Sequence, residues 1–166
     1  RSPELQKTWR LVVAGWDDGG HALSLKGRTI ALGLEAHITF TGPLFGNDKG
    51  AALAQAAAFV LPSYSEGLPM TILEAWSYGL PVFMTDACNL PEAFEAGAAY
   101  RISTDPVGLA ATLAEGLSAP SDLTCMGERG RMLTEERFAW STVAKHWAEL
   151  YSWLLHRGPK PDFVDE

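Results

Sequence analysis

Two glutamates near the middle of the chain, Glu66 and Glu74, stand eight positions apart and are the first candidates for chemistry. Glu74 is the only charged residue between positions 67 and 85, in a run rich in large apolar side chains. Because an ionised carboxylate in such surroundings loses hydration, we expect hydrogen-bond donors close to it, from the protein or from a ligand. The plainer alternatives are a helix carboxylate that reaches water for Glu74 and a solvated loop residue for Glu66.

The residues between these glutamates predict a helix over residues 70–78. Pro69 suits the first helical position, because its φ is fixed and it has no N–H to lose, and Gly79 suits the position just past the last turn. The backbone amides of Met70 and Thr71 then have no partner inside the helix. Together with the positive end of the helix dipole, they predict a site for an anion such as phosphate.

The two carboxylates flank this predicted anion site. Glu66 precedes the helix, and Glu74 follows its start by a rise of roughly 7–8 Å at about 1.5 Å per residue. A ligand with hydroxyl groups at both ends and an anion in its middle matches this layout. A nucleotide-sugar, with its ribose, diphosphate and hexose, has that form.

Short apolar segments alternate with helical ones through residue 104, which indicates an α/β fold with a Rossmann-like, mostly parallel sheet and helices on both faces. In such sheets ligands bind beyond the carboxyl ends of the strands, where residues 62–69 fall. The predicted strands are 7–15, 37–41, 58–61, 80–85 and 98–102. The predicted helices are 21–34, 47–58, 70–78, 90–96, 106–117, 121–137 and 140–155.

Composition narrows the function classes. The chain has 166 residues and a net charge of −7, which argues against a general nucleic-acid surface. Two cysteines, Cys88 and Cys125, are too few for a disulfide framework. The dinucleotide, P-loop and hydrolase-elbow motifs do not occur. With no apolar run of membrane length and no apolar signal region at its start, we expect a soluble, intracellular domain over residues 1–157, followed by a polar tail, 158–166.

The segment "LPSYSEGLPMTILEAWSYGLPV" holds both glutamates in an E-x7-E pattern between a strand end and a strand start. It resembles the signature of the family 4 (group 1) retaining glycosyltransferases of the GT-B fold. The resemblance extends from about Trp9 to about Tyr151 and is to the C-terminal, donor-binding half of those enzymes. The segments "GWDDGGH", "GPLFGNDKGA" and "CNLPE" are similar to one bacterial subgroup.

The resemblance implies a role for each matching position. Glu66 is the catalytic residue, which meets the donor hexose together with the donor-binding residues Gly67 and Leu68. The amides of Met70 and Thr71 meet the diphosphate. The other implied donor-binding residues are Glu74, on the ribose, and Gly42 and Leu44, on the base.

The resemblance also implies the reaction, which is retaining transfer of a sugar from a nucleoside-diphosphate sugar to a glycan or lipid-linked acceptor in polysaccharide biosynthesis. It implies no metal, no cofactor and no nucleic-acid partner. The acceptor is held by an N-terminal domain that this chain lacks, so the fragment alone is expected to be inactive. The implied location is cytoplasmic or at the inner face of the membrane, with peripheral association of the full-length enzyme. The alternatives are a non-catalytic nucleotide-sugar binding module and a GT-B sugar-nucleotide epimerase.

Two departures from the family pattern stand out. The family's donor half opens with a strand and a loop whose Arg and Lys clamp the diphosphate, and nothing before Trp9 supplies that element. A glycine pair common in the family is replaced by Ala87, Cys88 and Asn89.

Three other features have competing interpretations. Asp17 and Asp18 lack the D-x-D spacing of a metal site and are interpreted as turn residues. Trp16 either contacts a base or packs inside the fold. The tryptophans near the C-terminus are interpreted as core packing or as docking to a missing domain rather than as a lectin surface; they are Trp140, Trp147 and Trp153.

Overall fold

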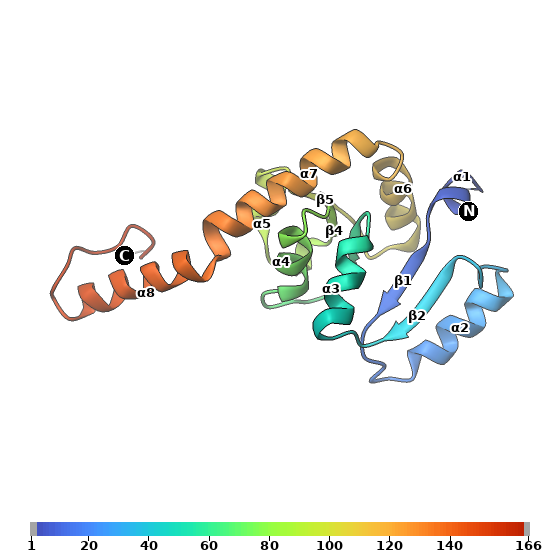
Figure 1. The fold of residues 1–166 in the computed structure, drawn as a ribbon, viewed down its shortest axis with the longest axis horizontal. Coiled ribbons are helices and arrows are strands. Elements are labelled where there is room, and N and C mark those ends of the chain that lie inside the picture. Colours follow the sequence, from blue (N-terminus) through green and yellow to red (C-terminus); the bar gives the residue numbers. More distant parts are fainter. Residues whose placement is uncertain (1–2, 165–166) are drawn as a thin grey trace. The chain divides into compact units, whose positions relative to one another are not determined.

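The structure is a computed structural model that describes residues 3–164, except for the side chains of Pro3, Glu4 and Pro120. Its contacts divide it into two compact units, residues 1–56 and residues 57–166 (Figure 1). No helix among the described residues is long and apolar enough to cross a membrane.

The first unit contains a two-stranded parallel sheet in which Leu11 pairs with Ile38. The apolar side chains of its first strand are only partly covered, since Leu11 and Val12 are about half exposed. The elements are α1 (Pro3–Thr8), β1 (Leu11–Ala14), α2 (His21–Ala31), β2 (Ile38–Gly42) and α3 (Gly46–Gln55).

The second unit is built on a three-stranded parallel sheet in the order β3-β4-β5. Its strands are β3 (Phe59–Leu61), β4 (Val82–Met84) and β5 (Ala99–Arg101). Its helices are α4 (Met70–Ser77), α5 (Pro91–Glu95), α6 (Pro106–Gly116), α7 (Pro120–Leu133) and α8 (Trp140–Leu154), with a 3₁₀ turn at Asp86–Cys88 and a π-helical turn at Thr134–Phe138. The expected parallel α/β organisation is confirmed, with one sheet in each unit.

The core of the second unit lies between its sheet and α4. The side chains of β4 are fully buried, which explains why this strand reads as a continuous apolar run. Trp76 of α4 is also fully buried, and its indole Nε1 donates a hydrogen bond to the Ala98 carbonyl at 3.2 Å. The rings of Phe83 and Tyr100 stack at 4.9 Å between centroids, joining β4 to β5.

Several sequence predictions need correction. The strand expected from residue 7 begins only at Leu11, because α1 occupies residues 3–8. In α2, Leu23 and Ile30 recur at helical spacing, which is typical of a buried face, yet they are 78% and 62% exposed. The helix predicted over residues 121–137 ends at Leu133 and continues as the π-helical turn.

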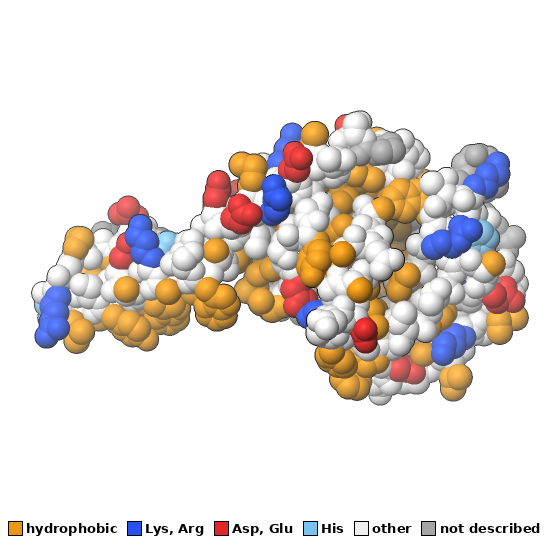
Figure 2. Space-filling view, viewed as in Figure 1, with side chains coloured by type: hydrophobic (Ala, Val, Ile, Leu, Met, Phe, Trp, Pro, Cys, Tyr) orange, Lys and Arg blue, Asp and Glu red, His pale blue; other side chains and the backbone are white. Residues whose placement is uncertain are grey.

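The C-terminal tryptophans do not pack as a group. Trp140 and Trp147 of α8 are exposed, whereas Trp153 is half-buried, so core packing does not explain the first two. Figure 2 shows hydrophobic side chains gathered along one edge of α8. The tail follows this helix, where the Phe163 ring lies 4.7 Å from the His146 ring; residues 165–166 lie outside the described residues.

Candidate functional site

Helix α4 begins at Met70, as its sequence predicted, but the position of Pro69 needs correction. Pro69 is the residue before the first turn rather than the first helical residue, with φ −74° and ψ 91°. Its carbonyl accepts a hydrogen bond from the Ile72 amide at 2.9 Å. Within the described part of the chain, the amides of Met70 and Thr71 have no partner. Both residues are exposed, so these two donors are open to a ligand.

The C-terminal end of α4 is closed by Gly79. This residue has φ +71°, and its amide donates to the Trp76 carbonyl at 2.8 Å. The Leu80 amide donates to the Ala75 carbonyl at 3.1 Å, which completes a Schellman motif. The bounds of this helix were therefore predictable from local residue types at both ends.

Glu66 is held in place before the helix by backbone and side-chain bonds. The Ser63 hydroxyl donates to Oε1 of Glu66 at 2.7 Å, and the Glu66 amide donates to the Ala87 carbonyl at 2.9 Å. Glu66 is half-buried. A carboxylate that accepts a short hydrogen bond has a restricted set of rotamers, so this side chain is oriented before any ligand arrives.

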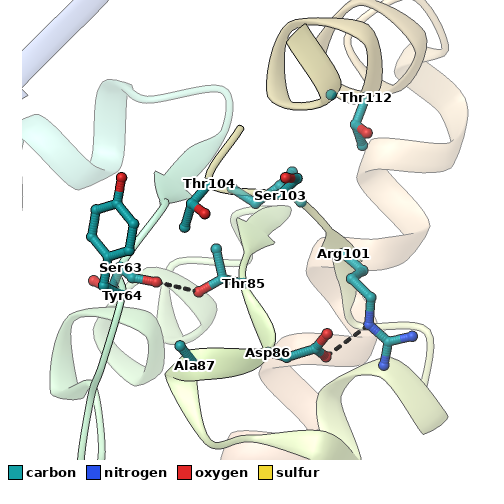
Figure 3. A pocket seen from close by; sticks show the side chains of 11 residues that line it. Ser63, Tyr64, Thr85, Asp86, Ala87, Arg101, Ser103, Thr104 and Thr112 are labelled. Atoms are coloured by element: carbon teal, nitrogen blue, oxygen red, sulfur yellow. Dashed lines mark hydrogen bonds and ion pairs between the residues drawn. The ribbon is translucent and has the colours of Figure 1, made fainter. Parts of the chain in front are cut away.

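The segment after β4 anchors the rest of the Glu66 loop. The Thr85 hydroxyl donates to the Ser63 carbonyl at 2.6 Å, a bond that Figure 3 shows at the edge of a pocket. The Asn89 side-chain amide donates to the Gly67 carbonyl at 3.3 Å. Asn89 itself has φ +57°, a conformation that Asn tolerates better than most residues. The Ala87-Cys88-Asn89 segment thus replaces the expected glycine pair with a hydrogen-bonded support.

Glu74 lies one turn into α4 and is half-buried. The apolar face of the helix is buried through Ile72 and Trp76, whereas Met70, at the helix start, is 57% exposed. The apolar run from residue 67 to residue 85 favours a buried helix, but the first turn of α4 is exposed. That exposure leaves the amide end of α4 accessible while its other face is fixed in the core.

Helix α7 packs closely against α4 at two glycines that the sequence did not mark as important. A Cβ atom at Gly127 would lie 1.9 Å from the Gly79 carbonyl oxygen, and one at Gly130 would lie 2.1 Å from Cδ1 of Trp76. No other residue type fits at this separation. The three-residue spacing of Gly127 and Gly130 in a helical stretch was the available signal, because it places both on one helix face.

The remaining predicted residues belong to the first unit. Gly42 and Leu44 lie at the end of β2, where the Gly15 amide donates to the Gly42 carbonyl at 3.1 Å. The Trp16 ring lies 5.8 Å from the Phe45 ring, yet Trp16 is 73% exposed, so it does not pack inside the fold.

Asp17, the first residue of the acidic pair, bonds a nearby backbone amide, as its interpretation as a turn residue predicted. Asp17 Oδ1 accepts a hydrogen bond from the Ala22 amide at 3.2 Å and so satisfies an amide in the first turn of α2.

Comparison with known proteins identifies the family. Residues 1–132 match the family described as "Glycosyl transferases group 1", which is well over half of the chain. The chain belongs to this family. The group 1 chain is 30% identical over 129 residues to the MMP alpha-(1->4)-mannosyltransferase of Mycolicibacterium hassiacum, covering 76% of the chain and 31% of that protein.

A second relative is the GDP-mannose:cellobiosyl-diphosphopolyprenol alpha-mannosyltransferase of Komagataeibacter xylinus. It is 29% identical to this chain over 152 residues, covering 90% of the chain and 38% of that protein. The chain therefore spans about a third of the length of these relatives.

Solved structures show the same fold. The Anabaena Alr3699/HepE structure in complex with UDP aligns with a TM-score of 0.76 and 20% identity, covering 87% of this chain and 41% of that one. The group 1 chain therefore has the Rossmann-like architecture of a GT-B half, as its sequence predicted.

Proposed function

We propose that the full-length protein is a retaining glycosyltransferase and that this chain carries its donor site. The donor is a nucleoside-diphosphate sugar, and the acceptor is a glycan or a lipid-linked glycan. The observation that carries the proposal is the open amide pair of Met70 and Thr71 at the start of a buried helix, flanked by Glu66 and Glu74. Support also comes from the mannosyltransferase relatives and from the UDP bound in the Anabaena structure.

In this proposal the helix start holds the diphosphate. The two amides and the helix dipole stabilise the negative charge that the leaving diphosphate acquires as the glycosidic bond breaks. Glu74, one turn further along the helix, accepts hydrogen bonds from the ribose. Gly42 and Leu44 contact the base.

Glu66 acts on the sugar, together with Gly67 and Leu68. Because Ser63 and Ala87 already fix its side chain and backbone, Glu66 positions the hexose without having to be ordered by it. The rate advantage comes from this fixed geometry and from the charge stabilisation at the helix start.

Residues 1–157 form the donor-binding domain in this proposal. The Arg and Lys clamp and the acceptor-binding domain implied by the family resemblance belong to other parts of the protein, and the full-length enzyme works in the cytoplasm or at the inner membrane face. The chain spans about a third of the length of its relatives, which supports this division.

Calorimetric titration with UDP, GDP, ADP and pyrophosphate tests the donor site. We expect one nucleoside diphosphate to bind better than pyrophosphate, and Glu74→Gln to weaken it about tenfold or more, because a hydrogen bond to a charged group contributes about 1.5–3 kcal/mol. Pyrophosphate should lose less affinity. The matched control is Glu115→Gln, at an exposed position of α6, which should change neither affinity. Equal losses for nucleotide and pyrophosphate would refute the ribose role.

A further inference from the structure

A polar pocket opens next to the loop that carries Glu66, residues 62–69, at the carboxyl ends of the three strands of the second unit. It has a volume of about 600 Å³ and is lined by eleven residues, none of which is in α4. This volume lies within the range of about 300–1,000 Å³ typical of small-molecule sites. Two of its lining residues, Ser63 and Ala87, are the ones that hold Glu66. A ligand in the pocket is therefore close to the proposed site of sugar transfer.

Arg101 is held rigidly at the rim of this pocket. Its Nε donates to Asp86 Oδ1 at 2.8 Å, and its guanidinium carbon lies 4.3 Å from the centroid of the Phe94 ring. Among the described residues, its two terminal nitrogens have no hydrogen-bond partner, and Figure 3 shows both directed away from Asp86. The Arg101 side chain is 61% exposed, so these nitrogens are accessible to a ligand.

The charge of the pocket favours a neutral ligand. Among the described residues that line it, Arg101 and Asp86 alone are charged, and they neutralise each other. Because Asp86 neutralises Arg101, the lining supplies no net positive charge to balance a phosphate dianion. A neutral group that both donates and accepts hydrogen bonds can use the guanidinium and the carboxylate together.

The rest of the lining suits a polyhydroxylated ligand. Three hydroxyl groups, on Tyr64, Thr104 and Thr112, have no hydrogen-bond partner among the residues that the structure describes. Tyr64 is also 83% exposed, so its ring offers an apolar face beside these polar groups. A sugar ring, with hydroxyls at its edge and C–H groups on its faces, has the complementary chemistry.

We propose that this pocket is a subsite for a neutral sugar unit of the glycan acceptor, anchored by Arg101 and Asp86 and covered by Tyr64. The inference that this sugar belongs to the acceptor rests on the proposed function, because transfer requires a glycan beside Glu66. The nucleoside diphosphate binds elsewhere, at the start of α4. The two sites share the Glu66 loop but no charged residue.

The test is a titration of the ¹⁵N-labelled chain with methyl α-D-mannopyranoside, methyl α-D-glucopyranoside and cellobiose, followed by backbone amide shifts. We expect millimolar binding of at least one of them, with shifts concentrated at residues 85–87 and 101–104. Arg101→Ala should weaken this binding at least fivefold. Tyr64→Ala should weaken it as well, and because Tyr64 is exposed, this second variant tests the pocket without disturbing the core. The matched control is Arg131→Ala, which removes an exposed arginine paired with Glu135 outside the pocket and should leave sugar binding unchanged.

The outcomes separate this proposal from the donor site. Arg101→Ala should leave UDP affinity within twofold, whereas Glu74→Gln should weaken UDP and leave the sugar unaffected. The proposal is overturned by absence of binding at 50 mM sugar, by equal effects of Arg101→Ala and Arg131→Ala, or by Arg101-dependent binding of inorganic phosphate instead. Shifts at residues 101–104 with UDP-glucose or GDP-mannose, but with none of the free sugars, would assign the pocket to the donor hexose and equally overturn it.

Discussion

The tight contact between α7 and α4 predicts that Gly130→Ala destabilises the second unit. A methyl group at this position meets Cδ1 of Trp76 at 2.1 Å, and the next two nearest atoms belong to the same indole ring. Ordinary contact begins at 3.4 Å, so the helices must separate by about 1.3 Å, the difference between 3.4 Å and 2.1 Å. The indole is fully buried and cannot turn aside without breaking its bond to the Ala98 carbonyl.

The expected cost follows from these contacts. Overpacking costs about 1–3 kcal/mol, and weakening a buried hydrogen bond adds about 1 kcal/mol. The higher helix propensity of alanine relative to glycine offsets up to about 1 kcal/mol of this destabilisation. We therefore expect Gly130→Ala to lower the free energy of unfolding by roughly 2 kcal/mol. Because α7 supports the helix that carries the open amides, the affinity for nucleoside diphosphate should fall as well.

The assay is urea unfolding followed by tryptophan fluorescence and far-ultraviolet circular dichroism. The matched control is Gly27→Ala, since Gly27 is also inside a helix but a Cβ there has no atom within 4 Å. That change should stabilise the protein by up to about 1 kcal/mol. If Gly130→Ala unfolds at the same urea concentration as the wild type, or at a higher one, α7 does not pack on Trp76 as described.

Three further predictions concern the Glu66 loop and the reaction. In the full-length enzyme, Glu66→Ala should reduce sugar transfer but leave calorimetric affinity for the bare nucleoside diphosphate within twofold; a comparable loss for both the bare diphosphate and the sugar donor would contradict its role on the hexose. Ser63→Ala should lower kcat about tenfold with little change in KM, since it removes the 2.7 Å hydrogen bond that orients the Glu66 carboxylate. An unchanged kcat would show that this bond does not position Glu66. The 166-residue chain alone should bind donor weakly and transfer no labelled sugar to lipid or oligosaccharide acceptors, because a single sugar subsite does not orient the acceptor without the acceptor-binding domain. Turnover by the chain alone would disprove the division into a donor-binding and an acceptor-binding domain.

The features that the sequence predicted well depend on residues that lie close together in the chain. The bounds of α4 follow from Pro69 and Gly79, because a fixed φ at one end and a positive φ at the other act within a single turn. The parallel sheets follow from the alternation of apolar strands with helices.

The features that the sequence did not reveal depend on partners distant in the chain. Thr85 supports the Ser63 carbonyl from 22 positions away, and no spacing rule pairs two such residues across separate strands. The closeness of Gly130 to Trp76 depends on how two helices cross, which periodicity does not specify. The contacts of Arg101 were not predictable for the same reason, since Asp86 and Phe94 approach it from other elements.

Exposed apolar residues were the other source of error. Leu23 and Ile30 have helical spacing, and such a pattern predicts a buried face only when another element lies against it. In the first unit, this face of α2 remains exposed.

The most direct test of the donor site follows the backbone amides of Met70 and Thr71 during titration with the nucleoside diphosphate that binds best. Because these amides are the open donors at the start of α4, we predict that their ¹⁵N and ¹H shifts move among the furthest of all assigned signals and saturate with the calorimetric dissociation constant. Binding that leaves both amide signals unmoved at saturation would contradict the account.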